Sequence, residues 1–466
     1  MTAGETDEPL ALRLAAWFAG LEWQALPKRQ RDLAQLRLLD TIGLILGGFA
    51  TPAAAIVRQR VGQEGAAGGA SLVGSAGKVP AGWAALAHGV AAHCHDYDDT
   101  FPDSVVHPGS VIVPVALGMG EELKASGAEI LTAIAGGYEI AARLARVGGR
   151  GFHQRGFHPS GIFAPIAAAF VAGRLMRLPA TASASAVGLA ASMSGGLFAF
   201  IADGSWSKWL HLGWGGFGGI LAAQLAAGGF RGPLGALDGR HNLYAAFLAG
   251  TPVSLDDTED GLGERWLGDT ALFKLYPCAH VIQPYIDLAL ELRRRHGIEA
   301  PAVTRIHCAV APWAVPIVCE PAAEKPNPPT KLEAIASLPY QLASALIDGS
   351  VGIETLEPPK LGRAEAAALA RRVTYAADPG IAGFGAALEI ELRDGRRFAA
   401  SGEAAAADAA RLGQKFRSLA VRALPVADVV RLEDLLERFA DAASAAPLGA
   451  LLRQARAQMP GSASLT

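Results

Sequence analysis

The chain has 466 residues, of which 51% are hydrophobic and 18% are charged, and its formal net charge is −3. This length and apolar content predict a folded protein of two or three domains, and the lack of a basic stripe argues against nucleic acid as a partner. Because the overall charge is slightly negative, any anionic ligand must be bound by local cations. The four cysteines form no Cys-x-x-Cys pair, which argues against a zinc knuckle or a disulfide framework and favours reduced thiols in the cytoplasm; they are Cys94, Cys278, Cys308 and Cys319.

The first ten residues include Glu5, Asp7 and Glu8 and lack a basic segment followed by an apolar one, so we expect no secretory signal. Two long stretches, residues 178–202 and 212–230, contain no Asp, Glu, Lys, Arg or His. The first contains a proline and four serines, and the second is rich in glycine. We therefore expect buried helices here and no membrane span.

Residues 10 to 269 have the pattern of helices. Apolar residues in the segment 38–46 recur at spacings of three and four. Several later segments are apolar on nearly every side and rich in Ala and Gly, which predicts interior helices that approach one another closely. These predicted helical segments are residues 83–92, 130–146, 165–176, 182–193 and 219–227.

The pattern changes near Lys274. Residues 303–310 alternate as in a strand, with Thr304, Ile306, Cys308 and Val310 on one side. A proline-rich loop at 319–330 and a helix at 331–348 follow, then strands at 372–376, 387–392 and 397–400, with Asp394-Gly395 as a hairpin turn.

The chain is helical again from Ala406, and we expect a disordered tail from Pro460. The fold class predicted by these patterns is mainly α. A large all-helical domain would comprise residues 1–269 and 402–466, with a smaller α+β domain, residues 270–401, inserted between its helices.

Six of the eleven histidines lie between residues 88 and 158, and the densest segment is residues 93–100, His-Cys-His-Asp-Tyr-Asp-Asp-Thr. If this segment is helical, His93, Asp96 and Thr100 share one face and the two aspartates after Tyr97 point elsewhere. The helix should end before Pro102.

Three interpretations of this segment remain open. The residues could cap helices and satisfy buried backbone groups. They could bind a metal, because His-x-His beside carboxylates resembles a metallohydrolase cluster, although Tyr97 stands where that pattern requires Asp. They could also perform acid–base chemistry in a pocket, which needs histidines and carboxylates with shifted pKa values but no metal-ligand spacing.

Two further segments combine cationic side chains with glycine. Residues 151–161 form a loop that leads into a helix near Ser160, and His158 at such a helix start suits either a carboxylate site or simple packing. Residues 203–213 contain Lys208 and His211, the cationic candidates between Arg177 and Arg231. A lysine among tryptophans either extends its ammonium group to solvent or binds an anion, and for Lys208 we favour the binding of an anion.

Together these segments resemble the MmgE/PrpD family, which includes 2-methylcitrate dehydratase, cis-aconitate decarboxylase and iminodisuccinate epimerase. The resemblance covers nearly the whole chain in the expected order. The matching segments are residues 95–100, His107-Pro108, 156–158, 208–213, 274–278 and 337–340, with weaker matches at 39–43 and Lys415-Phe416.

The resemblance implies a helical domain with an α+β lid, a homodimer, and a cofactor-free pocket without metal between domain and lid. It also implies that the protein is a lyase whose partner is a small di- or tricarboxylate substrate. The catalytic residues that it implies are Asp96, His107, His158, Lys208 and Tyr340, and the substrate-binding residues are Thr100, Lys274, His211 and His280.

The chemistry of the family explains these residue types. Removal of a proton next to a carboxylate builds negative charge, which Lys208, Lys274 and Thr100 would stabilise. His107 and His158 would move protons, Asp96 would orient or charge a histidine, and Tyr340 would donate from the lid.

We expect dehydration of a 2-methylcitrate-like hydroxy acid, with decarboxylation or epimerisation as alternatives and a metal-dependent hydrolase as the alternative from another class. Asp98 and Asp99 are both acidic where the 2-methylcitrate enzymes are expected to have Asn, and Val105-Val106 precede His107 in place of an aromatic residue and Gly. These differences weaken the link to that one substrate.

Overall fold

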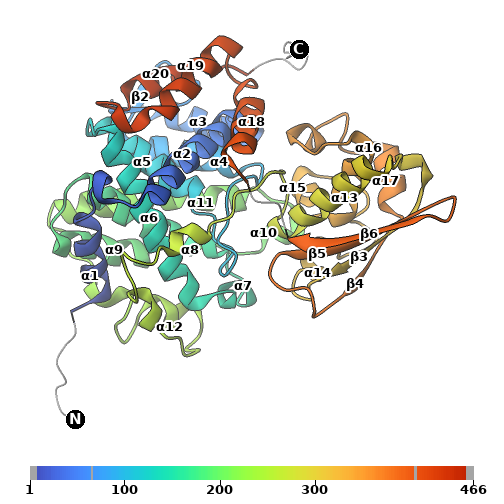
Figure 1. Ribbon diagram of the computed structural model, residues 1–466. Coiled ribbons are helices and arrows are strands. Elements are labelled where there is room, and N and C mark those ends of the chain that lie inside the picture. The colour runs from blue at the N-terminus through green and yellow to red at the C-terminus, as the bar shows by residue number, and fades with distance from the viewer. Residues whose placement is uncertain (1–7, 65–66, 404–406, 458–466) are drawn as a thin grey trace.

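The computed structural model describes residues 8–64, 67–403 and 407–457 (Figure 1). Its hydrophobic residues form two main cores, one built from residues 10–271 and 416–455 with Ile353, and the other from residues 276–392. We call residues 8–271 and 407–457 the helical body and residues 272–403 the small unit. The expectations for residues 1–7 and for the tail from Pro460 lie outside the described residues.

The helical body is built from helices whose limits agree with the apolar pattern to within a few residues at most of the predicted segments. Two large shifts occur at α8 and α11, which begin earlier than predicted. The helices are α1 (Leu10–Ala19), α2 (Lys28–Gly48), α3 (Pro52–Gln63), α4 (Ala81–His93), α5 (Gly109–Glu122), α6 (Gly127–Gly148), α7 (Gly151–Gln154), α8 (Pro159–Leu175), α9 (Ala180–Ser192), α10 (Phe200–Asp203), α11 (Ser207–Ala227), α12 (Leu243–Phe247), α18 (Ala409–Ala420), α19 (Val426–Glu437) and α20 (Ala446–Arg453). A short hairpin, β1 (Ala70–Ser71) with β2 (Lys78–Val79), joins α3 to α4.

Helix α11 packs closely on α4 and α8 because glycines face these neighbours. A Cβ added at Gly89 of α4 would lie 2.8 Å from the Cα of Gly213 in α11, and one added at Gly215 would collide with Ala164 of α8. The small side chains therefore allow the close helix contacts that the composition predicted. This packing brings together the end of α4 and the beginnings of α8 and α11, which carry the candidate site.

The small unit is a four-stranded sheet with helices on one face (Figure 1). Its strand order is β4-β3-β5-β6, with β3 parallel to β4 and the other neighbours antiparallel. Alternate residues of β5 are buried, so one face of the sheet packs on helices. The elements are α13 (Gln283–His296), β3 (Val303–Val310), α14 (Val315–Val318), α15 (Lys331–Ile335), α16 (Leu338–Asp348), α17 (Ala364–Ala370), β4 (Val373–Ala377), β5 (Gly385–Leu392) and β6 (Arg397–Glu403).

Two details of the small unit differ from the sequence prediction. The helix expected over 331–348 is broken into α15 and α16, because Ser337 starts a new helix by accepting a hydrogen bond from the Tyr340 amide. In β3, Ile306, Cys308 and Val310 are buried as predicted, but Thr304 is exposed. A register shift between Val303 and Arg305 reverses the alternation at that end.

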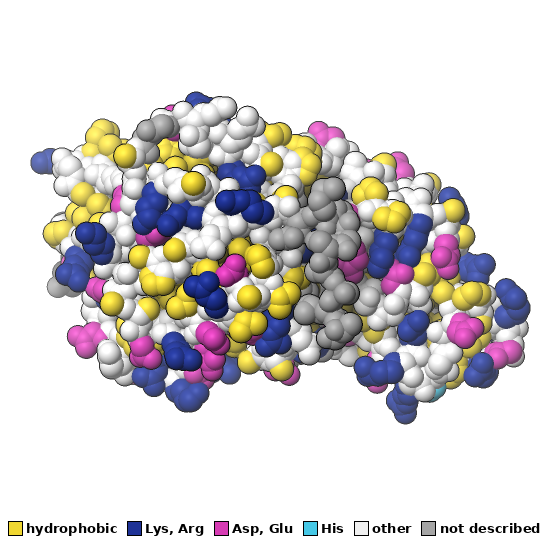
Figure 2. All heavy atoms as spheres, turned by 90° about the horizontal axis from the view of Figure 1, so that it is seen from above, with side chains coloured by type: hydrophobic (Ala, Val, Ile, Leu, Met, Phe, Trp, Pro, Cys, Tyr) yellow, Lys and Arg dark blue, Asp and Glu magenta, His cyan; other side chains and the backbone are white. Residues whose placement is uncertain are grey.

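In the described part of the chain no single helix is long and apolar enough to cross a membrane. Helices α2 and α3, which are joined at a bend, reach the necessary length and apolar composition only when they are counted together. Figure 2 shows both units from above, with Lys and Arg side chains scattered over this face and Asp and Glu between them.

Burial of His88 in α4 predicts loss of stability in acid. Its Nε2 accepts a hydrogen bond from the Val73 amide at 3.1 Å, and burial lowers the pKa of His88 to about 4. In the unfolded chain the pKa of His88 is near 6.5, so between pH 6.5 and 4 the unfolded chain binds a proton that the folded chain excludes. The contribution of neutral His88 to the free energy of unfolding is therefore lost as pH falls through that window. We expect His88→Gln to lose about 3 kcal/mol less unfolding free energy than the wild type between pH 7 and pH 4.

Urea unfolding at both pH values measures this difference. Equal losses in the two proteins would show that His88 does not carry the effect. Other titrating groups, including Asp99, are common to both proteins and cancel in the comparison.

Candidate active site

A cavity of about 90 Å³ lies between the helical body and the small unit. The body contributes most of its polar residues, and the small unit contributes Lys274 and His280. Apolar lining comes from α10 of the body and α15 of the small unit, which meet at the junction of the two units in Figure 1. Seven of the nine predicted site residues line this cavity: Asp96, Thr100, His107, His158, Lys208, Lys274 and His280.

The segment after His93 does not continue as a helix. Helix α4 ends at His93, and Asp96 adopts a left-handed backbone with φ 49°. The expected helical face of His93, Asp96 and Thr100 is therefore wrong. The expectation that Asp98 points elsewhere is also wrong, because its Oδ2 lies 2.8 Å from His93 Nδ1 and accepts from the Ser110 hydroxyl at 2.6 Å.

Asp96 lies between two lysines from distant parts of the chain. Its Oδ2 is 2.8 Å from Lys208 Nζ, and its Oδ1 is 2.8 Å from Lys274 Nζ, which also donates to the Asp96 carbonyl at 2.8 Å. Burial alone would raise the pKa of Asp96, but the two ammonium groups outweigh it and hold this pKa well below its usual range. The three groups carry a net charge of +1, which suits an anionic ligand.

His107 presents an unprotonated nitrogen to the cavity. Its Nδ1 lies 3.0 Å from the Asp99 carbonyl, which can only accept, so Nδ1 carries the proton. Its Nε2 faces Asp96 Oδ1 at 3.7 Å. Burial, opposed by Asp98 and reinforced by Lys274, lowers the pKa of His107 to about 3, so the imidazole is neutral near pH 7. A neutral Nε2 beside two cations can act as a base.

Asp99 supports His107 from outside the cavity. Its Oδ1 accepts from the Gly109 amide at 2.9 Å and its Oδ2 from the Tyr138 hydroxyl at 2.6 Å. Burial raises the pKa of Asp99 to about 7. A Cβ at Gly109 would lie 2.7 Å from Asp99 Oδ1, so this position requires glycine. Asp99 therefore fixes the backbone around His107 and leaves the chemistry to other groups.

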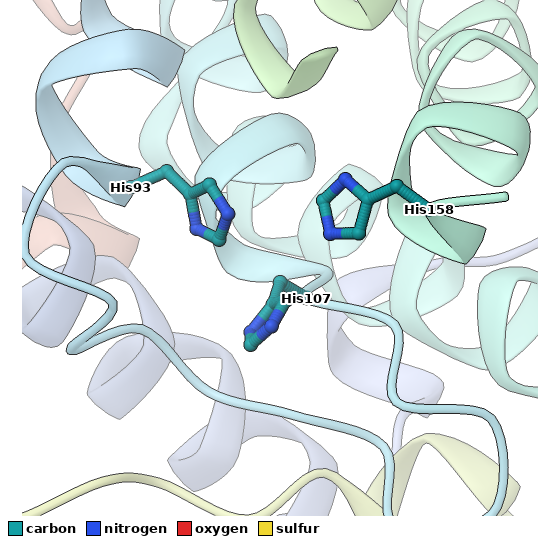
Figure 3. Close-up of side chains that lie close together, drawn as sticks. All are labelled: His93, His107 and His158. Atoms are coloured by element: carbon teal, nitrogen blue, oxygen red, sulfur yellow. The ribbon is translucent and has the colours of Figure 1, made fainter. Parts of the chain in front are cut away.

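Three histidine rings from different segments face one another (Figure 3). The ring centroids of His93 and His107 are 4.8 Å apart, and those of His107 and His158 are 6.4 Å apart. His158, which precedes α8, lies 3.0 Å from His211 by their Nδ1 atoms. Burial, with Lys208 next, lowers the pKa of His158 well below its ordinary value. His211 thus lies behind His158 and does not line the cavity.

Tyr340 does not reach the cavity, so its predicted place in the pocket is wrong. Its hydroxyl donates to the Thr355 carbonyl at 2.6 Å, and the side chain is 1% exposed in a small core with Ile335. The break before α16 turns Tyr340 inward, behind the cavity-lining Ile335. His280 does line the cavity, where its ring stacks on Phe384 with centroids 4.6 Å apart.

Three groups near this site are absent from the predicted catalytic and binding residues. His93 and Asp98 belong to the histidine-rich segment 93–100, and His153 belongs to the segment 151–161. His153 lines the cavity, and burial lowers its pKa to about 4. His93 and Asp98 meet because α4 ends at His93 and the chain then turns back. That turn has no recognisable sequence signature.

The histidines also form a possible metal site. One ligand atom each from His93, His107 and His158 lies within 4.8 Å of the others, and His93, Asp96, Asp98 and His107 form a second such group. Neutral imidazoles suit a metal, and among the described residues His93 Nε2 has no hydrogen-bond partner. The ammonium groups of Lys208 and Lys274 are both paired with Asp96, and their positive charge would repel a metal ion bound next to it.

Comparisons with known proteins match most of the chain to one family. Residues 12–256 match the MmgE/PrpD N-terminal domain, and residues 276–440 match the MmgE/PrpD C-terminal domain. The chain is 27% identical to a cis-aconitate decarboxylase of Mus musculus over 306 residues, 64% of this chain and 61% of that protein. Identity to a cis-aconitate decarboxylase of Aspergillus terreus (strain NIH 2624 / FGSC A1156) is 23% over 291 residues, 60% of this chain and 59% of that one. The alignments thus span about three fifths of these relatives, while the two domain matches cover most of the chain, which belongs to the MmgE/PrpD family.

Proposed function

We propose that this protein is a lyase that removes a proton next to a carboxylate of a small di- or tricarboxylic acid. The observation that carries this proposal is the neutral Nε2 of His107 beside the Lys208–Asp96–Lys274 group. An ammonium has three N–H donors, so Lys208 can bind a substrate carboxylate while it remains paired with Asp96.

The proposed mechanism uses this arrangement in two steps. The ammonium groups hold one carboxylate and stabilise the charge that develops as the adjacent C–H bond is broken. His107 Nε2 accepts that proton, and the anionic substrate raises the pKa values of His107 and His158. In a dehydration the C–O bond then breaks, and His158 gives a proton to the hydroxyl, which leaves as water. The chemistry requires no group beyond these side chains, so we propose a cofactor-free reaction.

The leaving group decides between the family's reactions. The family resemblance predicts dehydration of a 2-methylcitrate-like acid, but the Asp98-Asp99 pair weakens the link to that substrate. The curated relatives are named cis-aconitate decarboxylases, which favours decarboxylation as the first reaction to test. In that reaction the bond from carbon to a carboxylate breaks in place of the C–H bond, carbon dioxide leaves, and a protonated histidine supplies the proton that carbon receives.

We propose that the small unit is a lid. The cavity of about 90 Å³ is small beside typical ligand pockets of roughly 300–1,000 Å³. In the proposed cycle the small unit separates from the body to admit substrate and then closes over it.

Turnover of a panel of acids tests the function. Purified protein is incubated with cis-aconitate, citrate, 2-methylcitrate and succinate in D2O, and products and deuterium incorporation are followed by NMR. We expect loss of carbon dioxide or water from one acid. Exchange without net product would instead indicate epimerase chemistry, and neither product nor exchange on any acid would contradict the proposal.

The three facing histidines keep a metal-dependent hydrolase as the second candidate. Metal analysis of the purified protein and assays after chelation separate the two. The lyase proposal expects turnover that chelators leave unchanged. Stoichiometric metal, and activity restored only by its return, would support the second candidate.

We also propose that the protein is a homodimer that uses one face of α11. Trp206, Leu210, Trp214, Leu221 and Leu225 follow one another at helical spacing, and each is 37–53% exposed. An exposed apolar row of this length is typical of an interaction site, and two identical rows can pack on each other about a two-fold axis.

Light scattering after gel filtration checks this assembly. We expect a wild-type dimer, a monomeric Trp214→Glu variant, and a Val430→Glu variant that stays dimeric, because Val430 of α19 is similarly exposed at 52% but lies outside the row. A monomeric wild type, or a dimeric Trp214→Glu protein, would exclude this interface.

A further inference from the structure

Asp40 and Lys415 form a buried ion pair next to the site but outside the cavity. Asp40 lies on α2 and Lys415 on α18, their Oδ1 and Nζ atoms are 2.7 Å apart, and each side chain is 3% exposed. An ion pair this deep is expensive to desolvate and is weak support for stability by itself. Its other contacts indicate what it does.

The Lys415 ammonium binds the backbone on both sides of the Asp96–Lys274 ion pair. It donates to the Tyr97 carbonyl at 2.8 Å and to the Lys274 carbonyl at 3.0 Å. It also lies 4.0 Å from the centroid of the Tyr97 ring. Tyr97 directly follows Asp96, so one buried charge orients the backbone that carries both members of the pair.

The two segments are joined at further points. Thr100 and Leu272 exchange backbone hydrogen bonds of 3.0 and 2.9 Å, and the Tyr97 hydroxyl donates to the Leu275 carbonyl at 2.7 Å. Residues 272–275 are where the chain leaves the helical body, and α18 is the first helix after it returns. Lys415 therefore connects the site loop, the segment at which the chain leaves the body, and α18.

Helix packing places Lys415 at this point. Glycines of α2 let α18 approach closely, because a Cβ at Gly43 would lie 3.3 Å from the Phe416 Cα and one at Gly47 would lie 2.8 Å from Leu419 Cδ2. With larger residues at these positions, α18 would move away from the site loop and withdraw the Lys415 ammonium from both carbonyls.

We propose that Lys415, with its charge balanced by Asp40, is a positioning residue that sets the geometry of Asp96 and Lys274 for proton transfer. The inference rests on the proposed lyase function. Lys415 does not touch substrate; it acts through the backbone of Asp96, Tyr97 and Lys274.

Steady-state kinetics of matched variants provide the first test. We expect Lys415→Met to lower kcat by about 100-fold, because small misplacements of reacting groups have effects of that size. Lys415→Arg should restore part of the loss. The control is Glu139→Gln, which breaks a similarly buried ion pair, Glu139 with Arg143 at 2.6 Å, that does not line the cavity. We expect the control to lower the melting temperature but not kcat.

Asp40→Asn provides a second variant that keeps the lysine. Without the balancing carboxylate, the pKa of the buried Lys415 falls further, and the ammonium is lost above that pKa. We expect kcat of Asp40→Asn to recover as pH is lowered, whereas a purely structural defect would not recover. Wild-type kcat in Lys415→Met, or a pH profile of Asp40→Asn parallel to that of the wild type, would overturn the proposal.

Hydrogen exchange separates this inference from the proposed function. In Lys415→Met we expect faster amide exchange in both segments, residues 97–101 and 272–276, and no such change in Glu139→Gln. Unchanged exchange in both segments would reject the positioning role even if no acid were turned over. A wild type without turnover or deuterium exchange would instead reject the lyase proposal.

Discussion

Replacing His107 by Asn is expected to lower kcat/KM by about 10²- to 10⁴-fold, the range typical of a lost general base. The Asn amide can still donate to the Asp99 carbonyl, which the His107 Nδ1 contacts at 3.0 Å, so the loop keeps its support. Only the basic Nε2 is removed. Steady-state kinetics on the acid that the wild type consumes measure the effect.

The matched control is His88→Gln. His88 is also a buried histidine with a lowered pKa, but its Nε2 binds the Val73 amide inside the body. We expect wild-type turnover from this control at pH 7. A His107→Asn protein with kcat/KM within twofold of the wild type would show that another group accepts the proton.

The pH dependence of the wild type follows from the same pKa. A base works in its unprotonated form, so a His107 contribution is present above its pKa of about 3 in the free protein and is lost as pH falls through that value. His107 should therefore cause no loss of kcat/KM near pH 6.5, the ordinary range of histidine. A loss there that persists in His88→Gln and disappears in His107→Asn would contradict this assignment.

Replacing Lys208 by Met is expected to lower kcat/KM by about 10²- to 10³-fold, as when one stabilising donor for a developing negative charge is removed. The loss should appear mainly in kcat if Lys208 stabilises the deprotonated intermediate, and mainly in KM if it only docks the substrate. Lys208→Arg should restore part of the activity, because it keeps the positive charge beside Asp96.

Lys78→Met is the control for loss of a paired lysine. Lys78 contacts Glu121 at 2.6 Å. Glu121 lies at the C-terminal end of α5, whereas His107 precedes the N-terminal end of that helix. We expect its turnover to equal that of the wild type. Equal kcat/KM for Lys208→Met and Lys78→Met would remove Lys208 from the proposed mechanism.

Local patterns in the sequence predicted most secondary structure. The 3.6-residue periodicity and the small residues of the first 269 positions correspond to close-packed helices, and the alternation at 303–310 corresponds to β3. The Asp394-Gly395 turn is also present, with Gly395 at φ 88°. These features depend on neighbours within a few residues, which a sequence displays directly.

Two predicted helices are wrong where a distant contact interrupts a local pattern. Residues 93–100 have helical spacing, but the helix ends at His93 and the left-handed Asp96 redirects the chain. The segment 331–348 is helical in pattern, but Ser337 divides it and turns Tyr340 away from the cavity. In both places a contact with a distant segment stabilises the interruption: Lys274 donates to Asp96, and Thr355 accepts from Tyr340.

The sequence by itself predicted most of the helices and strands, and its family resemblance grouped nine cations, carboxylates, histidines and hydroxyl residues in one pocket. Only the tertiary structure decided that seven of them meet and through which contacts. Lys274 reaches Asp96 across 178 positions, and Lys415 reaches Tyr97 across 318. Such contacts depend on the paths of loops and on how closely glycine-bearing helices pack, and neither quantity is encoded in the spacing of neighbouring residues.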